Sequence, residues 1–187
     1  MTALPNLRSL RDRPFELLRE MERRGRAVAG GRRAAEGREW VGVAFRMGPE
    51  TFLVPRDEMR EVMALPSHLA RVPGARPWIL GLSNLRGQLL PVVDLRQFLG
   101  SGVTPAVRAS RVLVVNHRDI PAGLLVDEVL GFRRFAESEH VAVAPPTLVR
   151  CERYLAGAFR RGADGWPVIS LRRLVEHPSF LQASVPG

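Results

Sequence analysis

The sharpest pattern of apolar and polar positions lies between Trp78 and Gly100, in the stretch WILGLSNLRGQLLPVVDLRQFLG. An apolar run opens the stretch and a polar turn follows at 83–87. The second apolar run is short enough for a strand buried on both faces. Asp94 then occupies an N-cap position, and Gly100 is typical of the residue that follows a helix. The pattern predicts a strand, a tight turn, a second strand and a short capped helix.

The same kind of pattern continues on both sides of this stretch and predicts hairpins. The expected strands are Trp40–Met47, Thr51–Val54, Arg111–Val115, Ala122–Val126, Tyr154–Phe159 and Trp166–Ile169, and a short helix is expected over Leu171–Val175. Residues 57–63 fit either a strand or a helical turn. The sequence therefore predicts a mostly β fold with short capping helices.

Several segments return later in the chain, which indicates an internal repeat. The matched pairs are Trp78–Leu82 with Tyr154–Ala158 and Pro91–Arg96 with Pro167–Arg172, at an offset of 76 residues, and Asp57-Glu58 with Asp127-Glu128, at 70 residues. The repeat units are approximately 40–107 and 108–177. Each unit has about five short strands, a number that suits a small closed barrel with little free edge. We therefore expect two similar β-barrels that share a core.

The repeat also separates structural positions from candidate functional ones. Positions matched in both copies are best explained by backbone geometry and helix capping. They are Gly81 and Gly157, and the N-cap residues Asp94 and Ser170. The turn Asn84, Leu85, Arg86 and Gly87 aligns with 160–163 and is not repeated there. A feature of one copy is the better candidate for a specific task, although Arg86 could also be an ordinary solvated turn residue.

Residues 1–38 differ from the rest of the chain and are assigned to an N-terminal extension. Apolar residues recur with helical spacing over 14–28, which predicts an amphipathic helix followed by a Gly-rich linker. This helix either packs on the surface of the domain or binds a partner, and the sequence leaves both possibilities open. The domain itself is assigned to 39–180, with a short tail over 181–187.

The formal charge of +9 comes from 28 basic residues, all arginine, against 19 acidic ones. Such an excess is typical of proteins that bind nucleic acid or acidic partners, but a bias toward arginine on an ordinary surface is the alternative. Cys151 is the single cysteine, so an intramolecular disulfide is excluded. No apolar run approaches the roughly 20 residues that span a bilayer, and no secretory signal is apparent. We expect a cytoplasmic protein.

Familiar catalytic and cofactor motifs fail on spacing. Leu85 stands where a nucleophile elbow beginning at Gly81 needs its second glycine. The four histidines are far apart in sequence, and the absence of lysine rules out a phosphate-binding P-loop. The Asp-Glu pairs at 57–58 and 127–128 belong to the repeat, which favours a structural role. We expect no catalytic residue, no metal, no cofactor and no enzyme activity.

The motif NLRGQLLPVVDLR at 84–96, together with GLLVDEVLG at 123–131, resembles the CheW family of chemotaxis adaptors. The similarity covers roughly 39–175. It implies two five-stranded, SH3-like β-barrels around a common hydrophobic core, in agreement with the repeat. The segments FRMG at 45–48 and HRDIPAGLLVDEV at 117–129 resemble more narrowly the PilI-type adaptors of twitching-motility, or type IV pilus, systems.

This resemblance implies a non-catalytic adaptor, recruited to membrane-associated receptor arrays, that couples a chemoreceptor to a CheA-type histidine kinase. The kinase's SH3-like regulatory domain would dock on one barrel, and the receptor's cytoplasmic tip would enter a groove between the barrels. Arg86 matches the arginine of the family's NLRG turn, which is linked to the coupling of receptor and kinase. Glu61 matches a family glutamate linked to receptor binding, and Met59 matches an apolar contact position. We expect the guanidinium of Arg86 to hold the Glu61 carboxylate. No membrane insertion and no nucleic acid is implied.

A small basic β-barrel that binds nucleic acid is the alternative function, because barrels of this size and charge can do so. Its aromatic side chains argue against it, because they fall within apolar runs and suggest a core rather than a stacking platform. These aromatic residues are Trp40, Phe45, Phe52, Phe98, Phe132 and Trp166.

Overall fold

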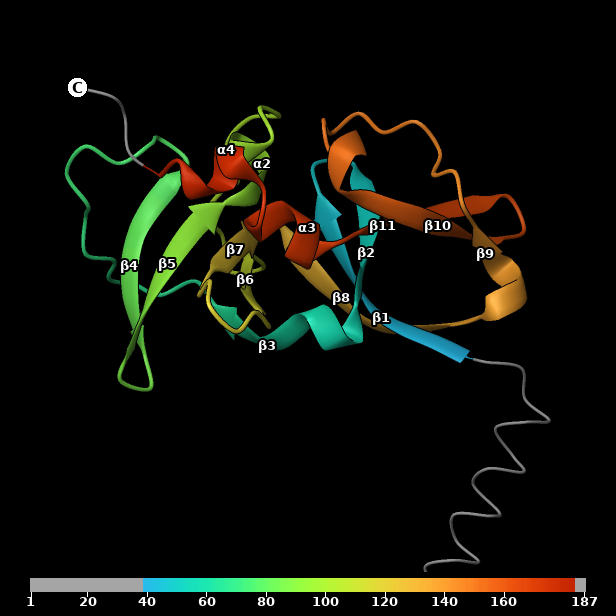
Figure 1. Ribbon diagram of the computed structural model, residues 1–187, viewed down its shortest axis with the longest axis horizontal. Coiled ribbons are helices and arrows are strands. Elements are labelled where there is room, and N and C mark those ends of the chain that lie inside the picture. Colours follow the sequence, from blue (N-terminus) through green and yellow to red (C-terminus); the bar gives the residue numbers. More distant parts are fainter. Residues whose placement is uncertain (1–38, 184–187) are drawn as a thin grey trace, which may run out of the picture. The chain divides into compact units, whose positions relative to one another are not determined.

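The computed structural model describes residues 39–183, whose strands form two mixed β-sheets (Figure 1). The larger sheet has the order β8 (Glu128–Ala136), β1 (Glu39–Met47), β2 (Glu50–Pro55), β11 (Asp164–Ile169), β10 (Leu155–Arg161), β9 (His140–Val141). The smaller sheet has the order β3 (Met59–Ala64), β6 (Arg111–Val115), β7 (Gly123–Val126), β5 (Gln88–Asp94), β4 (Ile79–Leu85). The prediction of a mostly β fold is confirmed.

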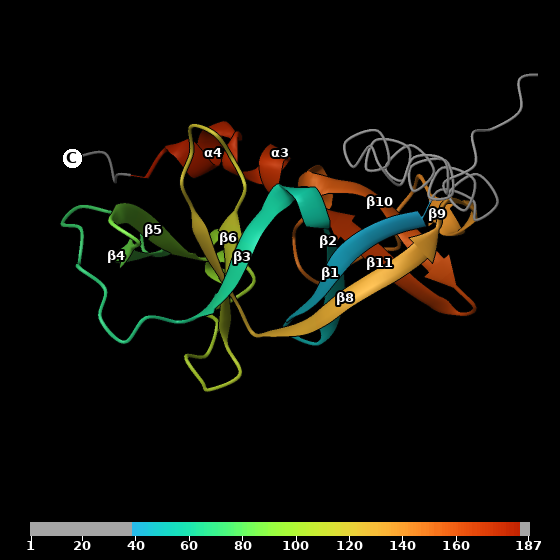
Figure 2. The same ribbon diagram turned by 90° about the horizontal axis from the view of Figure 1, so that it is seen from below.

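The helical segments within residues 39–183 are short, and Figure 2 shows the last two, α3 (Leu171–Val175) and α4 (Pro178–Leu181), on one side of the sheets. The third α-helix is α2 (Leu95–Phe98), and the 3-10 turns are η2 (Arg56–Glu58), η3 (Glu137–Glu139) and η4 (Glu152–Tyr154). Asp94 caps α2 by accepting a hydrogen bond from the Gln97 amide, and Ser170 caps α3 by accepting one from the Arg173 amide. The two N-cap side chains therefore satisfy the equivalent backbone amide in the two copies.

Each sheet contains strands from both copies of the repeat. The hairpin β1–β2 of the first copy lies between β8 and β11 of the second, and the hairpin β6–β7 of the second lies between β3 and β5 of the first. The exchange is symmetric, because Leu53 pairs with Val168 in parallel and Gly123 pairs with Val92 in parallel. These residues are related by the same offsets of 70 and 76 positions that relate the repeat units.

Gly81 and Gly157 sit at register shifts in β4 and β10, where the strand bends. Their φ angles are +146° and +108°, which favour glycine. A Cβ atom at Gly81 would lie 2.6 Å from the Ala70 carbonyl oxygen, and one at Gly157 would lie 2.8 Å from the His140 ring. Glycine is thus required at both places by backbone conformation and by close approach of the neighbouring chain.

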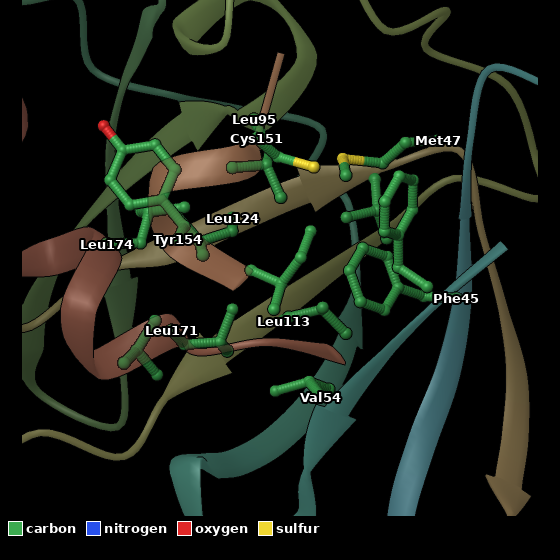
Figure 3. Packing of buried hydrophobic residues seen from close by; sticks show 14 of the residues in the cluster. Phe45, Met47, Val54, Leu95, Leu113, Leu124, Cys151, Tyr154, Leu171 and Leu174 are labelled. Atoms are coloured by element: carbon green, nitrogen blue, oxygen red, sulfur yellow. The ribbon is translucent and has the colours of Figure 1, made fainter. Parts of the chain in front are cut away.

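One large hydrophobic cluster joins the two sheets (Figure 3). Phe45 and Val54 enter it from the larger sheet, and Leu113 and Leu124 enter it from the smaller sheet. Helix α3 closes one side of the cluster with Leu171 and other buried residues. Since both sheets bury side chains in the same cluster, neither has a separate core of comparable size. The expected shared core is present.

The predicted pair of closed, five-stranded barrels is not confirmed. The sheets have six and five strands, and the outermost strands of each sheet do not form a ladder with one another. In the smaller sheet, the edge strands β3 and β4 approach through a single isolated bridge between Ala70, in the loop after β3, and Leu82 of β4. The sheet curls toward closure, but only a short segment of backbone connects its edges.

The ends of the chain and Phe132 complete the comparison with the predicted fold. The predicted amphipathic helix over 14–28 and the end of the tail lie outside the described residues. Phe132 was expected in the core, but its side chain is 60% exposed. It lies on β8, an edge strand of the larger sheet, where the Arg56 guanidinium approaches the exposed ring to 6.0 Å.

A candidate partner-binding site at the Arg86 turn

The turn between β4 and β5 has only two residues. Leu85 pairs with Gln88, so Arg86 and Gly87 form the loop, with φ angles of 52° and 84°. Two consecutive positive φ angles are the signature of a type I′ turn, whose twist matches that of the flanking strands. The Asn84 side chain accepts a hydrogen bond from the Gly87 amide at 2.8 Å and fixes the turn from within.

Arg86 is held in an unfavourable backbone conformation. Among residues 39–183 it is the one residue other than glycine with a positive φ. The left-handed conformation costs an L-residue about 1–2 kcal/mol. The second copy places Gly162 at the aligned position, with a φ of 62°, and so avoids that strain. Backbone strain of this kind is concentrated at functional sites, which makes the Arg86 side chain a candidate.

The guanidinium of Arg86 reaches across the open edge of the smaller sheet to Glu61 on β3. Its Nη2 atom lies 2.7 Å from the Glu61 Oε2 atom, so the contact expected from the sequence is present. The Arg86 side chain is 70% exposed and that of Glu61 is 24% exposed. An exposed pair of this kind contributes about 0–1 kcal/mol to stability. Most of the guanidinium therefore remains available to a partner.

The carboxylate of Glu61 is only partly satisfied. Its Oε1 atom is buried and has no hydrogen-bond partner among the described residues. Glu61 is positioned by a β-bulge, because Met59 pairs with Val115 while Glu61 pairs with Val114. The extra residue, Arg60, places Met59 and Glu61 on opposite faces of β3.

The bulge explains why Met59 is not part of this surface. Its side chain is 4% exposed and belongs to the large hydrophobic cluster. The expectation that Met59 contacts a partner is therefore corrected: a residue packed in the core offers no surface to another protein. Asn84, Arg86 and Gly87 are exposed, and Leu85 is half-buried.

A groove of about 650 Å³ opens beside the turn. It is lined by Arg60, Leu85, Gln88, Leu89, Leu90, Val114, Val115, Asn116, His117, Arg118 and Pro121. Sequence reasoning missed this groove because it read 88–93 as a strand buried on both faces. Leu89 is instead 65% exposed, since it lies at the free end of the hairpin. The position of Leu89 close to the turn, and the arginines of neighbouring segments, were the signals available in the sequence.

The remaining chemistry of the described residues is sparse. Residues 39–183 contain no group of three or more His, Cys, Asp or Glu side chains arranged to hold a metal ion. No helix in this part of the chain is long and apolar enough to cross a membrane. Burial raises the pKa of the Cys151 thiol to about 11, which makes it a poor nucleophile at neutral pH.

Comparison with known proteins gives a consistent picture. The profile of the CheW-like domain matches residues 41–179. Protein PilI of Pseudomonas aeruginosa is 38% identical over 174 residues, which cover 92% of this chain and 97% of that protein. Chemotaxis protein CheW of Helicobacter pylori is 29% identical over 68% of this chain and 76% of that protein. The crystal structure of the scaffolding protein TtCheW from Thermoanaerobacter tengcongensis superposes with a TM-score of 0.65 at 24% identity, covering 76% of this chain and 96% of that one.

Proposed function

Because this chain belongs to the CheW-like domain family, we propose that it couples a methyl-accepting chemoreceptor to a CheA-type histidine kinase in a type IV pilus chemosensory system. Family membership makes it an adaptor of chemosensory signalling, and the likeness to PilI extends over nearly the whole chain. The finer assignments, to these two partners and to twitching motility, are our proposal. So is its place in the cytoplasm, at membrane-associated receptor arrays.

The observation that carries the proposal is the strained, exposed Arg86. An adaptor acts by presenting surfaces, so its functional residues are exposed side chains held in fixed positions. Arg86 meets both conditions, since its backbone is fixed by a type I′ turn and its side chain is oriented by Glu61. Arginine is also enriched among the residues that dominate binding energy at protein interfaces. We propose that Arg86, Glu61, Asn84, Leu85 and Gly87 form a partner-binding surface.

We propose that the kinase's SH3-like regulatory domain docks on one of the two sheets and that the receptor's cytoplasmic tip enters a groove between them, with each sheet corresponding to one SH3-like barrel of the family. Neither enzyme activity nor a cofactor is needed for this role. The nucleic-acid alternative is not supported, because the relatives are chemotaxis and PilI proteins and most of the aromatic rings are at least partly buried.

The test is a reconstitution with purified kinase and receptor signalling domains. Arg86→Glu is expected to weaken binding of one partner by about 2 kcal/mol or more, roughly thirtyfold, if Arg86 is an interface anchor. The matched control is Arg160→Glu, a charge reversal at an exposed residue of β10 in the other sheet. Wild-type co-assembly of receptor and kinase by the Arg86→Glu protein would reject Arg86 as a site residue.

The double change Arg86→Glu with Glu61→Arg asks whether the two residues act together. If it recovers binding that each single change loses, the orientation of the guanidinium by Glu61 matters for the partner. If the losses of the single changes simply add, the two side chains act independently. Complete failure of the wild-type chain to bring kinase and receptor together would reject the adaptor assignment to this pair of partners.

A further inference from the structure

The groove beside the Arg86 turn combines an apolar floor with a polar, basic rim. Leu90 and Val114 are buried residues that line the groove and form its apolar floor. Leu89, at 65% exposed, stands at the mouth of the groove together with half-buried Leu85. Exposed leucine next to a hollow of this size is the composition of a surface that packs against another protein.

The charge of the groove has one sign. Arg60 and Arg118 are exposed lining residues, and neither side chain makes a hydrogen bond or an ion pair within residues 39–183. His117 lines the groove as well, and the lining includes no carboxylate. Of the neighbouring carboxylates, Glu61 is paired with Arg86, and Glu176 is paired with the lining residue His117 at 3.1 Å.

We propose that this groove binds an acidic, amphipathic segment of the protein that docks at the Arg86 turn. An apolar side chain of the segment would cover Leu85 and Leu89, and its carboxylates would pair with Arg60 and Arg118. The inference rests on the proposed function, since it names the chemistry of the partner at the same site. Charge complementarity of this kind selects the partner and speeds association more than it adds affinity.

A polypeptide fits the groove better than a nucleic acid does. Single-stranded nucleic acids bind on exposed aromatic rings that stack with the bases, together with basic residues that follow the backbone. His117 is the one aromatic ring in the lining, and it is held by Glu176 and by the amides of Asp119 and Ile120. The floor of aliphatic side chains instead matches an apolar side chain of a protein.

The experiment uses the full chain and two synthetic helical peptides with the same apolar residues. One peptide carries Glu at its polar positions and the other carries Lys. The acidic peptide is expected to bind at least about tenfold more tightly than the basic peptide. The NMR shift changes that it causes should centre on Leu85, Leu89 and neighbouring groove residues. The double variant Arg60→Glu with Arg118→Glu is expected to reverse the preference, while Arg160→Glu is expected to leave it unchanged.

Several outcomes would overturn the inference. They are equal binding of both peptides, no binding of either, shift changes away from the groove, or tighter binding of a short single-stranded DNA than of the acidic peptide. If the double variant does not fold, the salt dependence and shift mapping of the wild-type chain decide between the same outcomes.

Failure here is distinguishable from failure of the proposed function. If the wild-type chain joins receptor and kinase but shows no preference for acidic peptide, the adaptor role stands and only the groove inference falls. If it prefers the acidic peptide but joins neither partner, the groove chemistry stands and the assigned partners are wrong.

Discussion

Replacing Arg86 with glycine separates the stability of the turn from its function. The change removes a left-handed arginine, which gains about 1–2 kcal/mol, but glycine increases the entropy of the unfolded chain by about 0.4–1 kcal/mol. It also removes the exposed ion pair with Glu61, which contributes about 0–1 kcal/mol. These contributions nearly cancel, so we expect the free energy of unfolding to change by less than about 1 kcal/mol.

The matched control is Gly162→Arg at the aligned turn of the second copy. A Cβ atom there meets nothing within 4 Å, so the cost is conformational alone. The left-handed arginine should cost about 1–2 kcal/mol, offset by about 0.4–1 kcal/mol because the unfolded chain loses the freedom of a glycine. Thermal melts and denaturant titrations of the two variants measure the stabilities, and partner titrations measure binding. We expect Arg86→Gly to melt within about 4 °C of the wild type, while partner affinity falls about thirtyfold. A stability loss above about 2 kcal/mol would refute this reasoning, since it would make Arg86 a structural residue.

Three further predictions follow from other parts of the domain. The Cys151 thiol, fully buried and with a pKa of about 11, should react with a thiol reagent at neutral pH only after denaturant unfolds the chain. The Arg161 guanidinium and the Ala136 amide lower the pKa of Glu139 from 4.5 to about 2, so the stabilisation by this pair should be complete above pH 4.5 and fade as the pH falls toward 2. The Arg161→Gln substitution should move the pKa of Glu139 back toward 4.5, which an NMR titration of the variant would measure. Fragments 1–105 and 106–187 should each lack a cooperative melt alone but regain one when mixed, and a cooperative melt of either fragment by itself would contradict the hairpin exchange.

Features set by neighbouring residues could be predicted from the sequence. The Asp94 and Ser170 caps, a tight turn within 83–87 and the special glycines depend on local backbone geometry, which particular residue types favour. The contact between Arg86 and Glu61 was expected from the family resemblance and from the complementary shapes of guanidinium and carboxylate. The repeat pointed to equivalent strands in the two copies, and the pairing of residues related by its offsets follows that pattern.

Features set by strand neighbours could not be predicted in the same way. Alternation with a period of two indicates which face of a strand a side chain occupies, but not which strand lies beside it or whether it is an edge. Phe132 is exposed because β8 is an edge strand, and Leu89 is exposed because the hairpin projects beyond its neighbours. Met59 is buried because a bulge at Arg60 shifts the register, and no sequence pattern marked that bulge.

The hairpin exchange bears on how an adaptor of this kind can transmit a signal. Parallel pairing of β2 with β11 and of β5 with β7 joins the two copies through backbone hydrogen bonds within both sheets. The shared hydrophobic cluster joins them again through side chains. Separating the two copies would break both ladders, and moving the two sheets apart would expose the shared cluster, so either change would cost an amount comparable to unfolding the domain. Partners bound to the two sheets are therefore held at a fixed mutual position. We expect coupling between receptor and kinase to depend on that placement rather than on bending within residues 39–183.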